Sequence, residues 1–219
     1  MRPYRARGLM RNGRRLGSHS PPKPYTPPAT PPGKINTTDL DSPKTPRGWV
    51  QGYNAQAATT ERQIVIAAEL TNSSADFGQI EPMVKAARRE LRTAGVADVP
   101  AVVVADAGYW HQVQIQALAS DGIQVLIPPD ANKRKGPRPG WDGGLYAFMR
   151  RVLATPAGAQ LYRKRSAMIE PVFGHTKFNR KIDRFQRRGR AACRSEWRLI
   201  MATHNLLKLH QHHIVTEIA

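Results

Sequence analysis

Ala101 to Ala105 read AVVVA, a short continuous apolar run that ends on Asp106. Such a run is typical of a fully buried strand inside an α/β sheet, so we predict a central strand at 101–105. In open α/β sheets, ligands gather outside the carboxyl ends of the strands. Asp106 therefore either faces a site or caps the helix that follows it, since aspartate is favoured as an N-cap. Position alone leaves both readings open.

The surrounding segments predict a mixed α/β sheet flanked by helices. By composition and alternation, the other expected strands are 53–58, 63–70 and 123–127. By apolar spacing, the expected helices are 80–95, 110–120, about 145 through Glu170 with a break near Pro156, and about 192–212. The order of the elements before residue 130 is β-β-α-β-α-β.

The first 48 residues carry ten of the eighteen prolines and almost no apolar periodicity. A segment of this composition cannot bury enough surface to offset chain entropy. We therefore expect a disordered Pro/Arg-rich tail at 1–48 and a folded domain at 49–213.

The net charge of +18 is placed at the two ends of the chain. Residues 1–50 carry ten Lys and Arg against two Asp, residues 51–149 carry nine against ten acids, and residues 150–208 carry fifteen against three. This balance favours a polyanionic partner, with nucleic acid first. No apolar run is long enough to span a bilayer, so we expect no membrane partner. A single cysteine, Cys193, excludes an internal disulfide and fits a reducing cytoplasm.

A second acid, Glu170, lies among cations in the stretch 161–184, in which Asp183 is the other acid. Arg163, Glu170 and Lys177 are seven residues apart and would share one helix face. Pro171 predicts a kink or a restart of the helix beside the carboxylate. The stretch by itself fits a solvated face with balanced charge, and it fits equally a metal-binding carboxylate bordered by cations that hold phosphates.

Pairing Glu170 with Asp106 favours the second interpretation. A strand-end aspartate and a helical acid are the layout of a site in which two Mg²⁺ or Mn²⁺ ions, about 3.5–4 Å apart, clamp a phosphodiester. Oxygen ligands suit Mg²⁺, and Arg163, Lys177 and Arg180 would hold phosphates nearby. We therefore predict that the two carboxylates approach each other within the span of such a metal pair.

The sequence contains three recognisable segments, which are GWVQGYNAQAA, VVADAGYW, and YRKRSAMIEPVFGHTK followed by HNLLKLH. Together they resemble the DDE transposases of bacterial insertion sequences, and most closely their IS1182-like group. The resemblance covers about 36–213. It implies an RNase H-like fold, Mg²⁺-dependent (or Mn²⁺-dependent) cleavage at transposon ends and strand transfer to target DNA in a bacterial cytoplasm, in association with the nucleoid. A homo-oligomer is a further expectation.

By position, the resemblance assigns two catalytic and metal-binding residues, Asp106 and Glu170. Tyr162, Arg165 and Lys177 resemble the family's signature around the glutamate. The family's first catalytic aspartate lies on the first strand of the sheet, and no strand carrying an aspartate is predicted in 1–48. The acids there are Asp39 and Asp41, in a turn-like segment, so that aspartate is either absent or Asp41. We therefore expect an incomplete sheet without its first strand, and a truncated chain that is inactive alone. The alternative function is a non-catalytic basic nucleic-acid-binding protein.

Other polar residues receive simpler interpretations. Asp76 is expected to cap a helix, and His204 is expected to belong to a polar tail with the histidines that follow it. Tyr109 and Trp110 are expected in the core or in the wall of a site.

Overall fold

The computed structural model describes Asp39, residues 52–130 and residues 140–218. For residues 214–218 it describes the backbone but not the side chains. Apart from Asp39, the predicted tail at 1–48 lies outside these residues. Residues 36–219 form one compact unit, and every element below belongs to it. In the part of the chain that the structure describes, no helix is both long and apolar enough to cross a membrane.

Four strands form at the predicted places, as two separate pairs. β1 (Asn54–Thr59) pairs antiparallel with β2 (Val65–Thr71). β3 (Val102–Val104) pairs parallel with β4 (Gln124–Leu126). The chain is therefore α/β, as predicted, but within residues 52–130 and 140–218 its strands make two two-stranded sheets in place of one continuous mixed sheet.

The helices also follow the prediction closely. They are α1 (Ile80–Thr93), the 3₁₀ turn η1 (Ala107–Tyr109), α2 (Gln112–Ser120), α3 (Gly144–Ala154), α4 (Pro156–Gly174), the π-helical turn η2 (His175–Asn179) and α5 (Arg190–Ile218). The sharp start of α4 has a local cause, because Thr155 Oγ1 accepts a 3.1 Å hydrogen bond from the Gly158 amide and Pro156 occupies the first turn.

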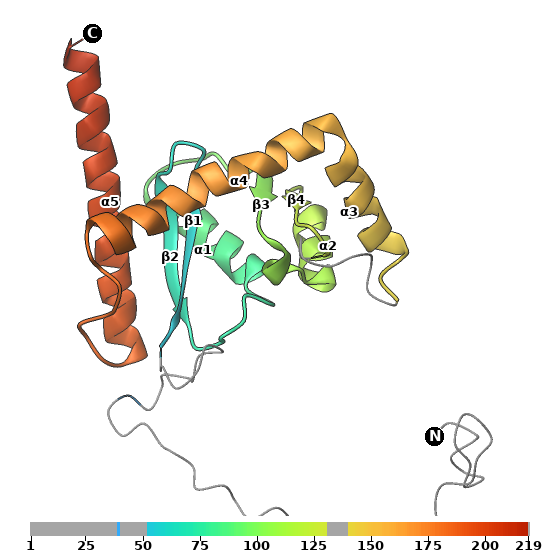
Figure 1. Cartoon of the computed structure of the whole chain (residues 1–219), viewed down its shortest axis with the longest axis horizontal. Coiled ribbons are helices and arrows are strands. Elements are labelled where there is room, and N and C mark those ends of the chain that lie inside the picture. The colour runs from blue at the N-terminus through green and yellow to red at the C-terminus, as the bar shows by residue number, and fades with distance from the viewer. Residues whose placement is uncertain (1–38, 40–51, 131–139, 219) are drawn as a thin grey trace, which may run out of the picture. The chain divides into compact units, whose positions relative to one another are not determined.

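Two main cores hold these elements together. One joins α1, α2, β4 and α3 through buried residues such as Val84, Leu118 and Ile127. The other joins β2, α4 and α5 through residues such as Val172 and Trp197. Figure 1 shows α4, in orange, crossing β1 and β3, while α5 stands beside β2.

The outer edge of β2 is covered by side chains of α5. Asn205 accepts from the Val65 amide and donates to the Val65 carbonyl, both at 2.8 Å. Arg198 donates to the Ala68 carbonyl and Arg190 to the Leu70 carbonyl. These bonds replace a neighbouring strand, so this edge of the sheet needs no further partner.

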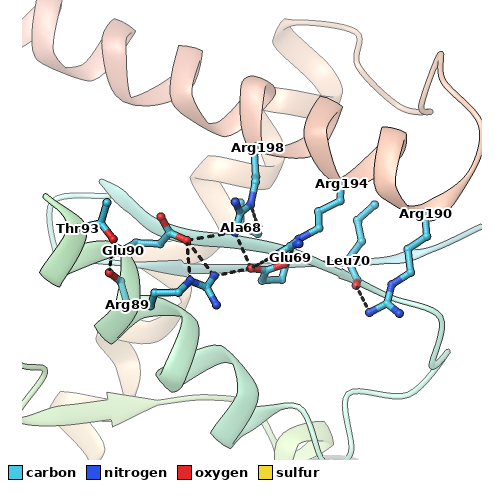
Figure 2. A network of polar contacts seen from close by, with 9 residues as sticks. All are labelled: Ala68, Glu69, Leu70, Arg89, Glu90, Thr93, Arg190, Arg194 and Arg198. Carbon is cyan, nitrogen blue, oxygen red and sulfur yellow. Dashed lines mark hydrogen bonds and ion pairs between the residues drawn. The ribbon is translucent and has the colours of Figure 1, made fainter.

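A charged network strengthens the same contact, as Figure 2 shows. Glu69 on β2 binds Arg194 and Arg198 of α5 and Arg89 of α1. Burial opposes ionisation of Glu69, but the hydrogen bonds from Arg194 and Arg198 outweigh it and lower its pKa from 4.5 to about 2. Glu69 therefore joins the strand to two helices.

The prediction of a fully buried strand at 101–105 is wrong. Val102 is 37% exposed, and Val103 and Val104 are half-buried. The physical reason is that, among the residues that the structure describes, β3 has a strand neighbour on one side only. Its other side faces the cavity that forms the candidate site.

A restart of the helix at Pro171 does not occur, since α4 runs through Pro171 to Gly174. Proline has no amide hydrogen, so Pro171 leaves the carbonyl four residues earlier, at Ala167, without its helical donor. Gln63 Nε2 donates a 2.9 Å hydrogen bond to that carbonyl. The helix therefore stays continuous, and its irregular part is the π turn immediately after it.

Candidate active site

A cavity of about 930 Å³ lies between the two sheets. β1 and β3 line its sides, and residues of α1 and α4 line it as well. Its polar residues gather at the two ends of these strands. Asp76, Asp106 and Tyr109 belong to one end, and Glu61 and Asp98 belong to the other.

Hydrogen bonds fix how β1 and β3 run relative to each other. Asp76 Oδ1 accepts from Asn54 Nδ2 and Gln56 Nε2, both at 2.8 Å. The Tyr109 hydroxyl, which follows the end of β3, donates to Gln56 Oε1 at 2.7 Å. The beginning of β1 therefore lies beside the end of β3, and the two strands run in opposite directions.

The prediction that Asp76 caps a helix is wrong. The N-cap of α1 is Gln79, and no side chain caps that end. The Asp76 carboxylate lines the cavity instead, because the two carboxamides of β1 hold it there. Asn54 and Gln56 are two residues apart, so they project from the same face of the strand, and that spacing was the sequence signal for this contact.

Asp106 caps the 3₁₀ turn η1 and not the expected helix, because the N-cap of α2 is His111. Its Oδ1 accepts a 2.8 Å hydrogen bond from the Gly108 amide and so caps η1, while the half-buried side chain also lines the cavity. A methyl group added at Gly108 would lie 3.0 Å from Asp106 Oδ1 and 3.3 Å from Asp76 Oδ2. The two carboxylates therefore flank Gly108, which leaves the space between them open.

Burial raises the pKa of the Tyr109 hydroxyl above its ordinary value, and the charges of Asp76 and Asp106 raise it further. Tyr109 therefore keeps its proton and remains the donor to Gln56. Its neighbour Trp110 is buried in the core. Both aromatic residues thus lie where the sequence placed them.

Glu170 reaches the same cavity from α4. Its carboxylate is exposed and lies 3.7 Å from Arg165 Nη2. Arg165 in turn lies over the Tyr162 ring, 5.7 Å from its centroid. Burial raises the pKa of Tyr162 and Asp106 adds to this effect, whereas Arg165 opposes it. Arg165 therefore links Tyr162 and Glu170 along one helix.

The remaining predicted cations have different surroundings. Arg163 is exposed on α4, and Lys177 is exposed at the rim of the cavity, 5.6 Å from the Phe173 ring centroid. Arg180 donates to the Ile200 carbonyl and to Thr203 Oγ1 of α5, at 3.0 and 2.7 Å. Arg163 and Lys177 are therefore available to a ligand, whereas Arg180 ties the π turn to α5.

His204 does not belong to a polar tail. It is 3% exposed, and its Nε2 lies 3.1 Å from the Gln63 carbonyl. Burial lowers its pKa. Its spacing with Trp197, Ile200 and Met201 on α5 was the sequence signal, because these residues share the buried face of the helix.

The donor chemistry of the cavity fits a divalent metal. Asp106 and Glu170 provide carboxylate oxygens, the ligands that Mg²⁺ and Mn²⁺ prefer, and Asp76 brings a third carboxylate beside Asp106. Among the residues described, no three acidic, histidine or cysteine side chains are close enough together to form a ready-made metal cluster. Asp39 does not line this cavity. Its carboxylate accepts hydrogen bonds from the Tyr53 hydroxyl and the Gly189 amide. Asp41 lies outside the described residues.

Comparison with known families gives a match to the model described as "Transposase DDE domain", over residues 30–206. This match covers well over half of the chain and includes every residue of the cavity. The IS1182-like subgroup stays a prediction. Neither the curated proteins nor the solved structures gave a match.

Proposed function

We propose that this chain, which belongs to the family of transposases with a DDE domain, acts in DNA transposition through the cavity between β1 and β3. The observation that carries the proposal is that Asp106 from the end of β3 and Glu170 from α4 line the same cavity. The reaction class is metal-dependent cleavage of a phosphodiester bond at transposon ends, followed by strand transfer to target DNA. Such a substrate places the activity in the bacterial cytoplasm.

Asp106 and Glu170 would hold Mg²⁺ or Mn²⁺, with Asp76 offering a further oxygen beside Asp106. The metal, when bound, would polarise the phosphodiester and stabilise the charge that develops on its oxygens. Arg165 is already beside Glu170, so it would orient that carboxylate and balance its charge. Tyr162 would in turn fix the guanidinium of Arg165 by stacking.

DNA would approach along the exposed side of α4 and the rim of the cavity. Arg163 and Lys177 are exposed there, and in the described part of the chain neither side chain forms an ion pair with an acidic residue. Each can therefore neutralise a phosphate and release a counterion. Arg180 is engaged with α5, and we assign it the role of holding the π turn that carries Lys177.

We propose in addition that the chain does not cleave DNA by itself. β1 and β3 belong to different sheets, and side chains tie their ends together, since Gln56 binds both Asp76 and Tyr109. Oxygen sites for Mg²⁺ need near-ideal geometry. We infer that the site reaches this geometry only when the space between the two strands is filled.

DNA binding can be tested by fluorescence anisotropy with a labelled duplex over a series of salt concentrations. If about five phosphates are contacted, the logarithm of the association constant should fall with the logarithm of salt at a slope of about −4 to −5. The double variant Arg163→Ala/Lys177→Ala should weaken binding and make the slope shallower by about 2. A matched control, Lys85→Ala/Arg92→Ala, removes two exposed cations from α1 and should change neither quantity. A flat titration, or equal losses in both double variants, would reject this DNA-binding surface.

A further inference from the structure

We propose that the exposed ring of Phe77, supported by His111, is a platform on which an unpaired base of DNA stacks beside the candidate active site. This inference rests on the proposed function, because it takes DNA as the substrate. It does not depend on a bound metal or on strand cleavage, so a DNA-binding measurement is sufficient to test it.

Phe77 is an aromatic residue that the fold leaves in solvent. It lies in the connection between β2 and α1 and is 60% exposed. Its ring takes no part in the three buried clusters of the described residues. An apolar ring in water gains free energy when a partner covers it. Phe77 is therefore available to a ligand, whereas a core aromatic such as Trp110 is not.

A second ring supports Phe77 from one side. The ring centroids of Phe77 and His111 are 4.7 Å apart, and their planes are inclined at 34°. His111 is itself fixed, because it is the N-cap of α2 and its Nδ1 accepts a 3.4 Å hydrogen bond from the Gln114 amide. With one face against the imidazole, the phenyl ring presents its other face to solvent.

A tight turn fixes the backbone that carries the ring. The Asp76 carbonyl accepts a 3.0 Å hydrogen bond from the Gln79 amide, which closes a β-turn with Phe77 and Gly78 at its centre. Gly78 has a φ of 80°, the value typical of the third residue of a type II turn. Gln114 Nε2 donates a 2.9 Å hydrogen bond to the Gly78 carbonyl. The ring is therefore held in place before a ligand arrives, which lowers the entropic cost of binding.

The first residue of this turn belongs to the candidate active site. Asp76 lines the cavity together with Asp106, and the two carboxylates flank Gly108. Phe77 comes directly after Asp76 but is not part of the cavity lining. A DNA strand bound at these carboxylates would therefore pass Phe77 at the edge of the cavity, within the span of a neighbouring nucleotide.

The last residue of the turn borders a cationic pocket. Gln79 lines a pocket of about 230 Å³, to which three arginines contribute, Arg89, Arg190 and Arg194. Arg190 is exposed and donates a 3.3 Å hydrogen bond to the Leu70 carbonyl (Figure 2), and in the described part of the chain it forms no ion pair. Its guanidinium can therefore also bind a phosphate. A nucleotide that leaves the duplex here would have a ring for its base and a cation for its phosphate.

The chemistry of the platform selects an unpaired base. In a duplex, the faces of each base are covered by its neighbours, whereas an unpaired base can rotate outward and stack on an aromatic side chain. Every base has such a face, so the contact tolerates any sequence. The cations Arg163 and Lys177 bind phosphates and cannot supply this contact.

The test uses fluorescence anisotropy with the full chain and two labelled duplexes, in EDTA so that no cleavage occurs. Each duplex has one unpaired position in its middle, which carries adenine in the first and an abasic analogue in the second. The two duplexes therefore have the same number of phosphates. The parent should bind the adenine duplex at least about fivefold more tightly than the abasic one, because stacking of a base on an aromatic side chain contributes on this scale.

Four variants assign this preference to the platform. Phe77→Ala should abolish it without changing the affinity for the abasic duplex, and Phe77→Trp should keep it. His111→Asn keeps a side chain that can cap α2 but removes the supporting ring, and should reduce the preference. The matched control Phe148→Ala removes a ring of α3 that is 51% exposed and should leave the preference unchanged.

The outcomes separate this inference from the proposed function. Equal binding of the two duplexes by the parent, or a preference that survives in Phe77→Ala, would overturn the platform alone. A change in the molecular mass of the chain in solution on Phe77→Ala would also overturn it, because the ring would then cover a second copy of the chain. If the parent binds neither duplex, the proposed function fails together with the platform.

Discussion

Gln63 Nε2 donates a 2.9 Å hydrogen bond to the carbonyl of Ala167, the one carbonyl of α4 that Pro171 leaves without a helical donor. Gln63 lies in the turn between β1 and β2 at a positive φ of 63°, an unusual conformation for a residue other than glycine. The contact fixes α4 against the β1–β2 hairpin next to Glu170. Pro171 therefore positions the carboxylate by freeing a carbonyl for docking, without breaking the helix.

Gln63→Ala should destabilise the protein by about 1 kcal/mol, because it leaves the Ala167 carbonyl without a partner and also removes the acceptor of Lys208. Urea unfolding followed by circular dichroism measures this change. The control Gln116→Ala alters an exposed glutamine of α2 and should stay within about 0.5 kcal/mol of the parent. Equal stabilities of the two variants would contradict the docking role.

Gly158→Ala should destabilise the α3–α4 junction strongly. A methyl group at Gly158 would lie 2.0 Å from the Val152 carbonyl oxygen, a backbone atom that cannot move without shifting α3. Gly174→Ala, in the last turn of α4, meets nothing within 4 Å and should stabilise the helix by about 0.5–1 kcal/mol. Thermal unfolding of the two variants should therefore move in opposite directions, and a shift of both in the same direction would contradict the packing described.

Glu69 should make the stability of the protein depend on acid pH. Its pKa in the folded state is about 2, below the ordinary value of 4.5, so its ionised form is favoured by folding. This contribution is complete above about pH 4.5 and is lost as the pH falls toward 2. After allowance for solvent screening, it should amount to about 1–2 kcal/mol.

The comparison with Glu69→Gln isolates this effect from the other carboxylates. The free energy of unfolding of the parent should exceed that of the variant at pH 6, and the difference should shrink between pH 4.5 and 2. A difference that stays constant over this range would show that the charge of Glu69 does not contribute as described.

Local patterns predicted much of the fold. The apolar spacing of Ile80, Val84 and Ala87 identified α1, and the turn at Pro156 separated α3 from α4 correctly. Such features depend on residues close together in the sequence. The buried strand at 101–105 failed as a prediction because full burial requires a neighbour on each side of β3, and a valine run does not specify whether both neighbours are present.

The candidate site was predicted only in part for a similar reason. Asp106 and Glu170 stand beside recognisable local signals, a strand end and a cation-rich helix. Asp76 has no such signal of its own, because its orientation comes from Asn54 and Gln56 on a different element. Arg180 likewise looks like any other cation in the sequence, and only its contacts with α5 distinguish it from Lys177.

The central claim is that Asp106 and Glu170 act together as metal ligands. Isothermal titration of the full chain with Mn²⁺, in the presence of a DNA duplex, tests it most directly. Mn²⁺ binding should be measurable in the parent, should be lost in both Asp106→Asn and Glu170→Gln, and should be kept in Asp98→Asn, which alters an acid at the opposite end of the same cavity. Equal Mn²⁺ binding by the parent and all three variants would contradict the account.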